Sequence, residues 1–342
     1  MNKSLNIKNR KRRQVKIGQE LVQKQLLNEE QQLPLVIKPM SADVNILEWV
    51  GKNRTALEKD LAKHGGILFR GFNIDEVDRF YDFIHQYSGN LLEYKDSATP
   101  RSNVNKQIYT STDYSAEHWI ELHNESAYSD QWPMKIFFNC QIPAQEGGET
   151  PILDSRKVYE KMDKRVRKKF EEKQVMYVRN FGLGVGQKWQ DVFQTEDKDQ
   201  VEEICEKSEM QCEWESDEHL RIKQIRPAVS QHPLTKEYVW FNQITAFNIT
   251  TLNEDVRQEL LREYGEMNVP KNTFYGDGTA IEAEVLEEIR RVYNEEMIVF
   301  PWEKGDLIVL DNMLVAHGRT SYKGKRKVLV GMTEPMKWSQ IK

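Results

Sequence analysis

The sequence has few cysteines and no long hydrophobic run. Cysteine occurs three times, at Cys140, Cys205 and Cys212, an odd number without the spacing of a metal-binding motif. These residues favour a reducing, cytoplasmic location over a disulfide framework. No stretch approaches the roughly 20 apolar residues that a membrane-spanning helix needs, and no apolar signal segment follows the N-terminus. We therefore expect no membrane association.

The sequence also lacks an excess of basic residues. Lysine and arginine together number 49, aspartate and glutamate 54, and the net charge is −5. This balance gives no overall footprint for nucleic acid, so no nucleic-acid partner is expected. The basic run at residues 8–16 is most simply a solvated terminus. With 39% hydrophobic and 30% charged residues, the chain has the composition of a globular protein with enough apolar side chains for a core.

The order of hydrophobic patterns predicts an antiparallel β core with helices around it and inserted between strands. Residues 1–33 are polar, so we expect a partly helical N-terminal extension followed by a single domain at 34–342. Helices are predicted at 45–65, after a cap at Asp75, at 155–171 with Asp154 as N-cap, at 254–265 with Gly265 as its stop, and at 280–294. Strands are predicted at 65–72, 118–154, 173–182, 219–229, 238–244, 297–318 and 325–335.

A possible metal site begins at "IELHNESAY", residues 120–128. If this segment is a strand, the side chains of His123 and Glu125 project from the same face and Asn124 projects from the other. An imidazole and a carboxylate side by side can chelate one ion, but two ligands hold a metal weakly. A third ligand should therefore come from another segment.

His317 is the best third ligand, because it ends the apolar segment "GDLIVLDNMLVAHGR" at the mouth of the strand bundle. Two histidines and one carboxylate on one face of a metal are typical of non-haem Fe(II) oxygenases. The alternative is a set of unrelated polar residues. The other five histidines are better explained as surface or packing residues; they are His64, His85, His118, His219 and His232.

Three runs occur in order and at fitting separations. They are "HNESAYSDQWPMKIFFNCQIPAQEGGETPILDSRKVY", "WFNQ" at 240–243 and "GDLIVLDNMLVAHGRTSYKGKRKVLVGM". Together they resemble the taurine dioxygenase (TauD/TfdA-like) family of Fe(II)/2-oxoglutarate-dependent dioxygenases, and within it the syringomycin-type aspartate hydroxylase branch of peptide biosynthesis. The resemblance covers residues 34–338 and implies a double-stranded β-helix, or jelly-roll, core.

The resemblance also implies roles for individual residues. His123, Glu125 and His317 would bind Fe(II), and Thr150 in "GGETP" would contact the cosubstrate 2-oxoglutarate. Arg326 would pair with the distal carboxylate of 2-oxoglutarate, because a guanidinium can grip a carboxylate through two parallel hydrogen bonds. Arg319 and Lys327 are near alternatives for this pairing.

The expected activity is O₂-dependent hydroxylation of an amino-acid-like substrate, either free or tethered to a carrier protein. Glu125 stands where related halogenases carry a small residue, so hydroxylation is favoured over halogenation. Segments 97–106, 181–189 and 240–248 are expected to line the pocket, with Arg101 and Asn242 as substrate contacts. Polar loops at 97–115 and 181–220 could form the entrance.

Several alternatives remain open. A carrier protein would need a basic docking patch, for which Lys188, Lys223, Arg226 and the N-terminal basic run are candidates. The other functional readings are a hydroxylase of a free small acid or amino acid, a Zn(II) hydrolase on the same ligands, and a catalytically silent jelly-roll binding protein. The sequence does not indicate an oligomeric state.

Overall fold

An eight-stranded sheet forms the centre of the molecule. The computed structural model describes residues 21–92, 103–105, 107–111 and 114–341. In spatial order the strands are β1 (Val22–Asn28), β2 (Gln31–Pro39), β3 (Gly66–Phe69), β16 (Leu307–Asp311), β7 (Gln131–Ile142), β19 (Lys327–Lys337), β5 (Ile108–Thr110) and β4 (Asn103–Asn105). Neighbouring strands are antiparallel except β2 and β3, which are parallel.

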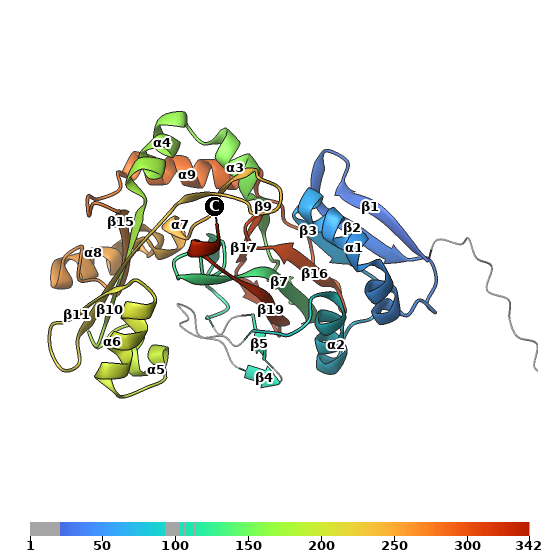
Figure 1. Cartoon of the computed structure of the whole chain (residues 1–342), viewed down its shortest axis with the longest axis horizontal. Helices are drawn as coiled ribbons and strands as arrows, with labels where there is room; N and C mark the ends of the chain where they lie inside the picture. Colours follow the sequence, from blue (N-terminus) through green and yellow to red (C-terminus); the bar gives the residue numbers. More distant parts are fainter. Residues whose placement is uncertain (1–20, 93–102, 106, 112–113, 342) are drawn as a thin grey trace, which may run out of the picture.

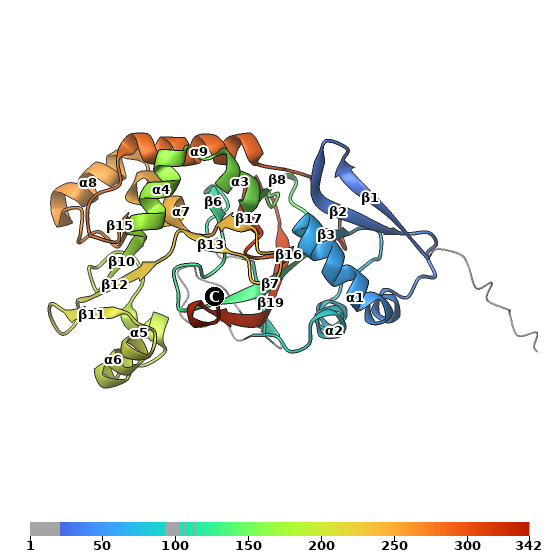
Figure 2. The same cartoon turned by 45° about the horizontal axis from the view of Figure 1, so that its top comes forward.

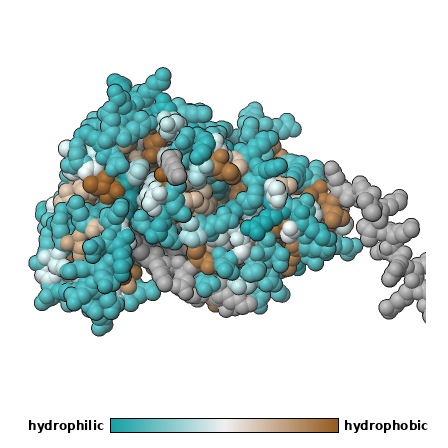
Figure 3. Space-filling view, in the orientation of Figure 1, coloured by the Kyte–Doolittle hydropathy of each residue, from teal (hydrophilic) through white to brown (hydrophobic). Residues whose placement is uncertain are grey.

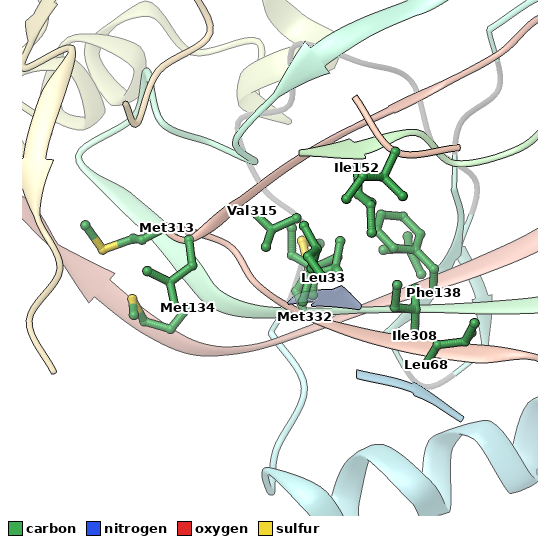
Figure 4. Packing of buried hydrophobic residues seen from close by; sticks show 14 of the residues in the cluster. Leu33, Leu68, Met134, Phe138, Ile152, Ile308, Met313, Val315 and Met332 are labelled. Carbon is green, nitrogen blue, oxygen red and sulfur yellow. The ribbon is translucent and has the colours of Figure 1, made fainter. Parts of the chain in front are cut away.

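A three-stranded sheet lies against this large sheet across a shared hydrophobic core. Its strands, in order, are β6 (Ile120–His123), β17 (Val315–Arg319) and β9 (Ile152–Asp154). Phe138, Ile308 and Met332 from the large sheet belong to the same buried cluster as Ile152 and Val315 from the small one (Figure 4). The two sheets thus pack as a sandwich around one core, which confirms the expected antiparallel β core.

Two helices cover the other face of the large sheet (Figure 1). They are α1 (Ile46–His64) and α2 (Val77–Tyr87). In β16 the side chains alternate, because Leu307 and Val309 pack in the cluster under these helices while Ile308 and Leu310 enter the sandwich core. Each such burial contributes about 1.5–3 kcal/mol, so β16, which is buried on both faces, anchors the sheet.

A second lobe lies beside the sandwich. Its sheet has the order β11 (Gln211–Trp214), β12 (Leu220–Arg226), β10 (Val175–Phe181) and β15 (Lys271–Tyr275). The helices are α3 (Ser155–Lys161), α4 (Lys164–Lys173), α5 (Trp189–Phe193), α6 (Lys198–Lys207), α7 (Ile244–Phe247), α8 (Glu254–Tyr264) and α9 (Ala283–Glu296). Figure 2 shows α4 and α9 running along one side of this lobe.

The remaining elements are short. They are the strand pairs β13 (Val229–Gln231) with β14 (Tyr238–Trp240) and β18 (Tyr322–Lys323) with β8 (Glu146–Gly147), and the 3-10 helices η1 (Ile249–Thr251) and η2 (Trp338–Gln340). A buried cluster that includes Leu153 of β9 and Ala316 of β17 also includes Tyr177 of β10 and Tyr275 of β15. This shared core joins the second lobe to the small sheet.

The expected helical character of the N-terminal segment is wrong for residues 22–33. Val22–Asn28 is strand β1, which forms an antiparallel hairpin with β2, and β2 pairs with β3 of the large sheet. The side chains of an edge strand face solvent over much of its length, so β1 carries no apolar alternation that would reveal it. Residues 1–20 lie outside the described part, and the division at residue 33 stays a prediction.

Two further local predictions are wrong. The helix expected over 155–171 is two helices, because Asp163 accepts a hydrogen bond from the backbone N–H of Arg165 and begins α4 as its N-cap. Asp154 caps α3 as predicted. Asp75 does not cap α2; Glu76 occupies that position without a side-chain hydrogen bond, and Asp75 pairs with Lys304 instead.

The surface agrees with the composition. The face seen in Figure 3 is mostly hydrophilic, and hydrophobic residues appear on it only in small separate patches. Among the described residues, no helix has both the length and the apolar character needed to cross a bilayer.

Candidate metal centre

The two histidines of the predicted triad face each other across two paired strands. His123 is the last residue of β6, and its direct partner in the antiparallel register is His317 of β17. Their ring centroids are 4.6 Å apart. A Cβ atom on Gly318 would lie 2.5 Å from the carbonyl oxygen of Ile120. Glycine at this position therefore allows the close approach of β6 to β17 that brings the two imidazoles together.

Glu125 completes the set from a turn rather than from a strand. Strand β6 ends at His123, so the expectation that one strand carries both ligands is wrong for Glu125. The turn nevertheless places Glu125 Oε2 3.9 Å from His123 Nε2 and 3.7 Å from His317 Nε2. One ligand atom from each of the three residues lies within 4.8 Å of the others.

The environment of His317 also differs from the prediction. The segment "GDLIVLDNMLVAHGR" is two strands, β16 in the large sheet and β17 in the small one, with a turn after Asp311. His317 therefore lies in the middle of β17 and not at the end of a single long strand. The turn carries the chain from one sheet to the other, which is how a ligand from the C-terminal region reaches the site.

The donor set fits a divalent iron ion. His123 Nδ1 lies 2.7 Å from the carbonyl oxygen of Glu121, to which it donates, so Nε2 keeps its lone pair for a metal. Nδ1 of His317 is buried and has no hydrogen-bond partner among the described residues, and its Nε2 is the atom nearest Glu125. Two imidazole nitrogens and one carboxylate on the same side of an ion leave positions open for further ligands, as non-haem Fe(II) chemistry requires.

A buried asparagine, for which no role was predicted, holds the Glu125 turn. Asn312 Oδ1 accepts from the backbone N–H of Glu125 at 2.7 Å, and its Nδ2 donates to the carbonyl oxygens of Glu125 and Pro133, both at 2.9 Å. Asn312 has no exposed surface. One side chain therefore fixes both backbone polar groups of the carboxylate ligand. Its only sequence signal is an Asp-Asn pair between two apolar strands.

Asn124 and Asn242 extend this support. The Asn124 side chain points away from the ligands, as predicted, and its Nδ2 donates to the carbonyl oxygen of Asn312 at 2.7 Å. Asn242 is fully buried; its Nδ2 donates to Ala228 O and its Oδ1 accepts from Ile244 N. The Asn242 side chain thus bonds to backbone groups, and a contact with substrate stays a prediction. Arg101 lies outside the described residues.

Arg326 is a partly buried cation that contacts Gly148, four residues before strand β9 of the small sheet. Its Nε donates to Gly148 O at 2.7 Å and its Nη1 to Ser111 Oγ at 3.1 Å. Among the described residues no carboxylate forms an ion pair with it. Burial, and then the nearby charge of Arg319, lower the pKa of Arg326 to about 10. Such a guanidinium is suited to receive an anionic ligand.

The other cosubstrate candidates differ in their contacts. The guanidinium of Arg319 is already used, because it donates to the carbonyl oxygens of Tyr114, Ser115 and His118 at 2.6–3.0 Å. Thr150 is buried, and its Oγ1 accepts from Trp302 Nε1 at 3.2 Å. It lies two residues before Ile152, the strand partner of His317 in β9.

The remaining histidines do not join the site. His232 donates from Nε2 to Asp311 Oδ2 at 3.1 Å, while its Nδ1 accepts from the backbone N–H of Thr235 at 3.1 Å. It is therefore a packing residue that holds the turn after β16. Within the described ranges, His123, Glu125 and His317 form the one group of three or more potential ligands close enough to hold a metal.

A two-sheet β core that presents two histidines from paired strands and a carboxylate from the turn that follows one of them defines the class of non-haem Fe(II) oxygenases. The profile of the taurine catabolism dioxygenase TauD, TfdA family matches residues 32–333. The chain therefore belongs to the TauD/TfdA family, as the sequence motifs predicted, and it is an Fe(II)/2-oxoglutarate-dependent dioxygenase.

Individual relatives agree with this assignment. The chain is 38% identical over 301 residues to the dapdiamide synthesis protein DdaC of Enterobacter agglomerans, covering 88% of this chain and 91% of that protein. It is 30% identical over 322 residues to a clavaminate synthase-like protein of Arabidopsis thaliana, covering 89% and 94%. The crystal structure of PvcB from Pseudomonas aeruginosa superposes with a TM-score of 0.55 at 14% identity, covering 92% and 91%. The structural likeness confirms the expected jelly-roll fold.

Replacing Asn312 by alanine is expected to weaken Fe(II) binding about ten- to a hundredfold, the usual effect of losing a residue that orients a metal ligand. The change leaves three buried backbone groups without their partner, so it also destabilises the fold by about 1–3 kcal/mol for each unsatisfied group. The measurement is Fe(II) titration against a competing chelator at a temperature where the variant stays folded.

A matched control separates iron binding from stability. Asn139 is equally buried and donates to the carbonyl oxygens of Ile74 and Asp306, away from the triad. Asn139→Ala should lower the unfolding temperature and leave the Fe(II) dissociation constant of the folded protein unchanged. Equal losses of iron affinity in both variants would show that Asn312 has no special relation to the ligand turn.

Proposed function

We propose that this dioxygenase hydroxylates an unactivated carbon of an amino-acid-like substrate in natural-product biosynthesis. His123, Glu125 and His317 bind Fe(II), and Arg326 and Thr150 hold 2-oxoglutarate. The observation that carries the proposal is the convergence of the three ligand atoms within 4.8 Å, together with the partly buried guanidinium of Arg326, which forms no carboxylate ion pair among the described residues. The two features match the two requirements of the reaction, a metal and an anionic cosubstrate.

When bound, iron would couple the oxidative decarboxylation of 2-oxoglutarate by O₂, which gives succinate and CO₂, to insertion of the second oxygen atom into a C–H bond of the substrate. The chain positions the iron, the cosubstrate and the substrate, and it shields the reacting groups from water. Arg326 grips the distal carboxylate of the cosubstrate, and Thr150 adds a hydroxyl near β9. Asn312 keeps the Glu125 carboxylate in place, and the hydrogen bond from His123 to the Glu121 carbonyl oxygen fixes the imidazole tautomer.

The biosynthetic setting rests on the relatives. The protein from Enterobacter agglomerans is described as a dapdiamide synthesis protein and is 38% identical to this chain over 301 residues. This supports the predicted assignment to a biosynthetic branch of the family and favours an amino-acid-like substrate. Glu125 retains its carboxylate in the ligand position, which supports hydroxylation rather than halogenation.

The structure alters the proposed route for a carrier protein. Of the predicted docking residues, Arg226 is buried and donates to Ser208 O at 2.5 Å, and Lys223 pairs with Glu213 at 2.7 Å. Of these three residues, only Lys188 is exposed. The entrance expected at 181–220 also contains α5, α6 and β11 rather than a continuous loop. A free substrate and a carrier-bound substrate therefore both remain in the proposal.

Anaerobic addition of Fe(II) and 2-oxoglutarate tests the proposed site directly. We expect a weak metal-to-ligand absorption band in the visible, because the cosubstrate chelates iron held by the triad. Zn(II) in place of Fe(II) should give no band and serves as the control. A Zn(II) hydrolase or a silent binding protein would form no such band, and its absence from the wild-type protein would contradict the proposal.

Offering candidate amino acids both free and loaded on a carrier protein tests the form of the substrate. We expect succinate release coupled to a mass gain of one oxygen atom with the carrier-bound form, because this would match the peptide-biosynthesis branch that the sequence resembles. Equal or faster turnover of the free amino acid would exclude the requirement for a carrier and leave the oxygenase assignment intact.

A further inference from the structure

Two basic side chains oppose each other on the sheet of the second lobe. Arg179 in β10 and Lys271 in β15 are direct partners in the antiparallel register, so both project from the same face of the sheet. Arg179 is 3% exposed and Lys271 is partly buried. Like charges directly opposite each other repel, which disfavours this pairing in a sheet.

The contacts of Lys271 supply no counter-charge. Its Nζ donates to the carbonyl oxygen of Ala246 at 3.1 Å and lies 5.3 Å from the ring centroid of Phe247. Among the described residues no carboxylate forms an ion pair with it. Burial, and then repulsion by Arg179, lower the pKa of Lys271 to about 8. An anion bound next to Lys271 would offset this desolvation and repulsion and so stabilise the charged form of its side chain.

The cation pair lies close to the turn of the metal ligand Glu125. The guanidinium carbon of Arg179 is 5.7 Å from the ring centroid of Tyr128, which ends that turn. The Tyr128 ring is in turn 4.8 Å from the ring of Phe247, over which Lys271 lies. Arg179 thus lies against the ring that ends the turn of the carboxylate ligand, and the ring of Phe247 separates Lys271 from that turn.

The next row of the same sheet face adds polar groups. Gln224 is the register partner of Tyr177, two residues from Arg179 along β10, and is 1% exposed. Neither polar atom of its side chain has a hydrogen-bond partner within the described part of the chain. The hydroxyl of Tyr177 accepts from the backbone N–H of Gln243, whose Nε2 donates to Asn124 O beside the triad. This face is therefore polar, enclosed and connected to the metal centre.

We propose that Arg179 and Lys271 bind a carboxylate of the primary substrate, beside the rings of Tyr128 and Phe247. The assignment rests on the proposed function and makes it more specific, because the substrate must carry an anionic group. For a free amino acid this is the α-carboxylate or a side-chain carboxylate. For a carrier-bound residue, whose α-carboxyl is esterified, it is the side-chain carboxylate.

A competing explanation makes Lys271 a structural residue that caps the carbonyl end of α7 through Ala246. Stability distinguishes the two roles without knowledge of the substrate. Lys271→Met keeps the length of the side chain and removes the opposed charge, so the unfolding temperature without ligand should stay the same or rise. A purely capping role predicts a fall.

The control for this substitution is Lys173→Met. Lys173 Nζ also lies over an aromatic ring, 5.2 Å from the centroid of Tyr275, but it is paired with Asp277 at 2.6 Å. Removing it breaks an ion pair instead of relieving repulsion, so its unfolding temperature should not rise.

Binding is measured on the full chain loaded with Mn(II) and saturating N-oxalylglycine, so that the cosubstrate site is occupied. The probes are N-acetylglycine and its neutral counterpart N-acetylglycinamide, added at increasing concentration while the unfolding temperature is followed. We expect the carboxylate to raise this temperature in the wild type, Lys271→Arg and Lys173→Met, and the amide to have little effect. In Lys271→Met the dissociation constant for the carboxylate should increase about tenfold or more, as for a lost charge-assisted hydrogen bond.

Several outcomes would overturn the assignment. They are equal stabilisation by the acid and the amide in the wild type, no stabilisation by the acid, an unchanged response in Lys271→Met, or a fall in the ligand-free unfolding temperature of that variant. The visible band with Fe(II) and 2-oxoglutarate is recorded on the same wild-type preparation. If the band forms and the probes fail, only the carboxylate subsite is wrong; if the band is absent, the proposed function itself fails.

Discussion

Alanine in place of His123, Glu125 or His317 is expected to abolish 2-oxoglutarate turnover and to weaken Fe(II) binding strongly. Each residue supplies one of three ligand atoms that lie within 4.8 Å of one another, and two remaining ligands hold a metal only weakly. Succinate formation and Fe(II) titration are the measurements. Each loss should be nearly complete by itself, because the three ligands act as one unit.

These variants should remain folded. The three side chains meet one another and contribute little to the hydrophobic clusters, so the unfolding temperature of the metal-free protein should not fall appreciably. His118→Ala is the matched control, because His118 is exposed and close in sequence to His123; it should retain turnover and iron binding. Near wild-type succinate production by any one triad variant would remove that residue from the ligand set.

Local signals in the sequence were sufficient for several elements. The helix expected at 254–265 is α8, and Gly265 at its C-cap donates its N–H to Leu261 O, as a C-terminal glycine commonly does. Asp154 caps α3 for an equally local reason. Both signals act within one turn of helix, so no knowledge of distant segments was needed.

Elements that depend on distant partners were predicted less well. The polar strand β1 exists because β2 pairs with it and continues the large sheet through β3. The break between α3 and α4 was missed for a local reason instead: Asp163 accepts a hydrogen bond from the backbone N–H of Arg165 and caps a second helix, while the apolar spacing continues across the break. Neither the strand pairing of β1 nor the hydrogen bond that caps α4 changes the spacing of apolar residues, so the hydrophobic pattern could not reveal them.

In the site, too, residues with a local sequence signal could be predicted, and residues that act through contacts between distant segments could not. His123 and Glu125 could be found because they are close in sequence, and His317 because it follows an apolar segment and belongs to a family motif. Asn312 supports Glu125 from 187 residues away, and Arg179 meets Lys271 only through the pairing of β10 with β15. Their roles become visible only when the strand order is known.

Replacing Arg326 is expected to act on the cosubstrate. Arg326→Ala removes a charge-assisted pair of about 1.5–3 kcal/mol, so the apparent affinity for 2-oxoglutarate should fall about ten- to a hundredfold. Thr150→Ala should have a milder effect, because it removes one neutral hydrogen bond. The measurements are the KM for 2-oxoglutarate and the concentration of 2-oxoglutarate that half-saturates the anaerobic Fe(II) absorption band.

Arg319→Ala provides the comparison, because the two arginines differ in what their guanidinium groups already contact. Arg319 donates to three backbone carbonyl oxygens at residues 114, 115 and 118, so its loss should lower the unfolding temperature more than it raises the KM for 2-oxoglutarate. Arg326 has hydrogen bonds to Gly148 O and Ser111 Oγ but no carboxylate ion pair among the described residues, which leaves its charge for a ligand. An unchanged 2-oxoglutarate constant in Arg326→Ala, with a large increase in Arg319→Ala, would transfer the cosubstrate role to Arg319.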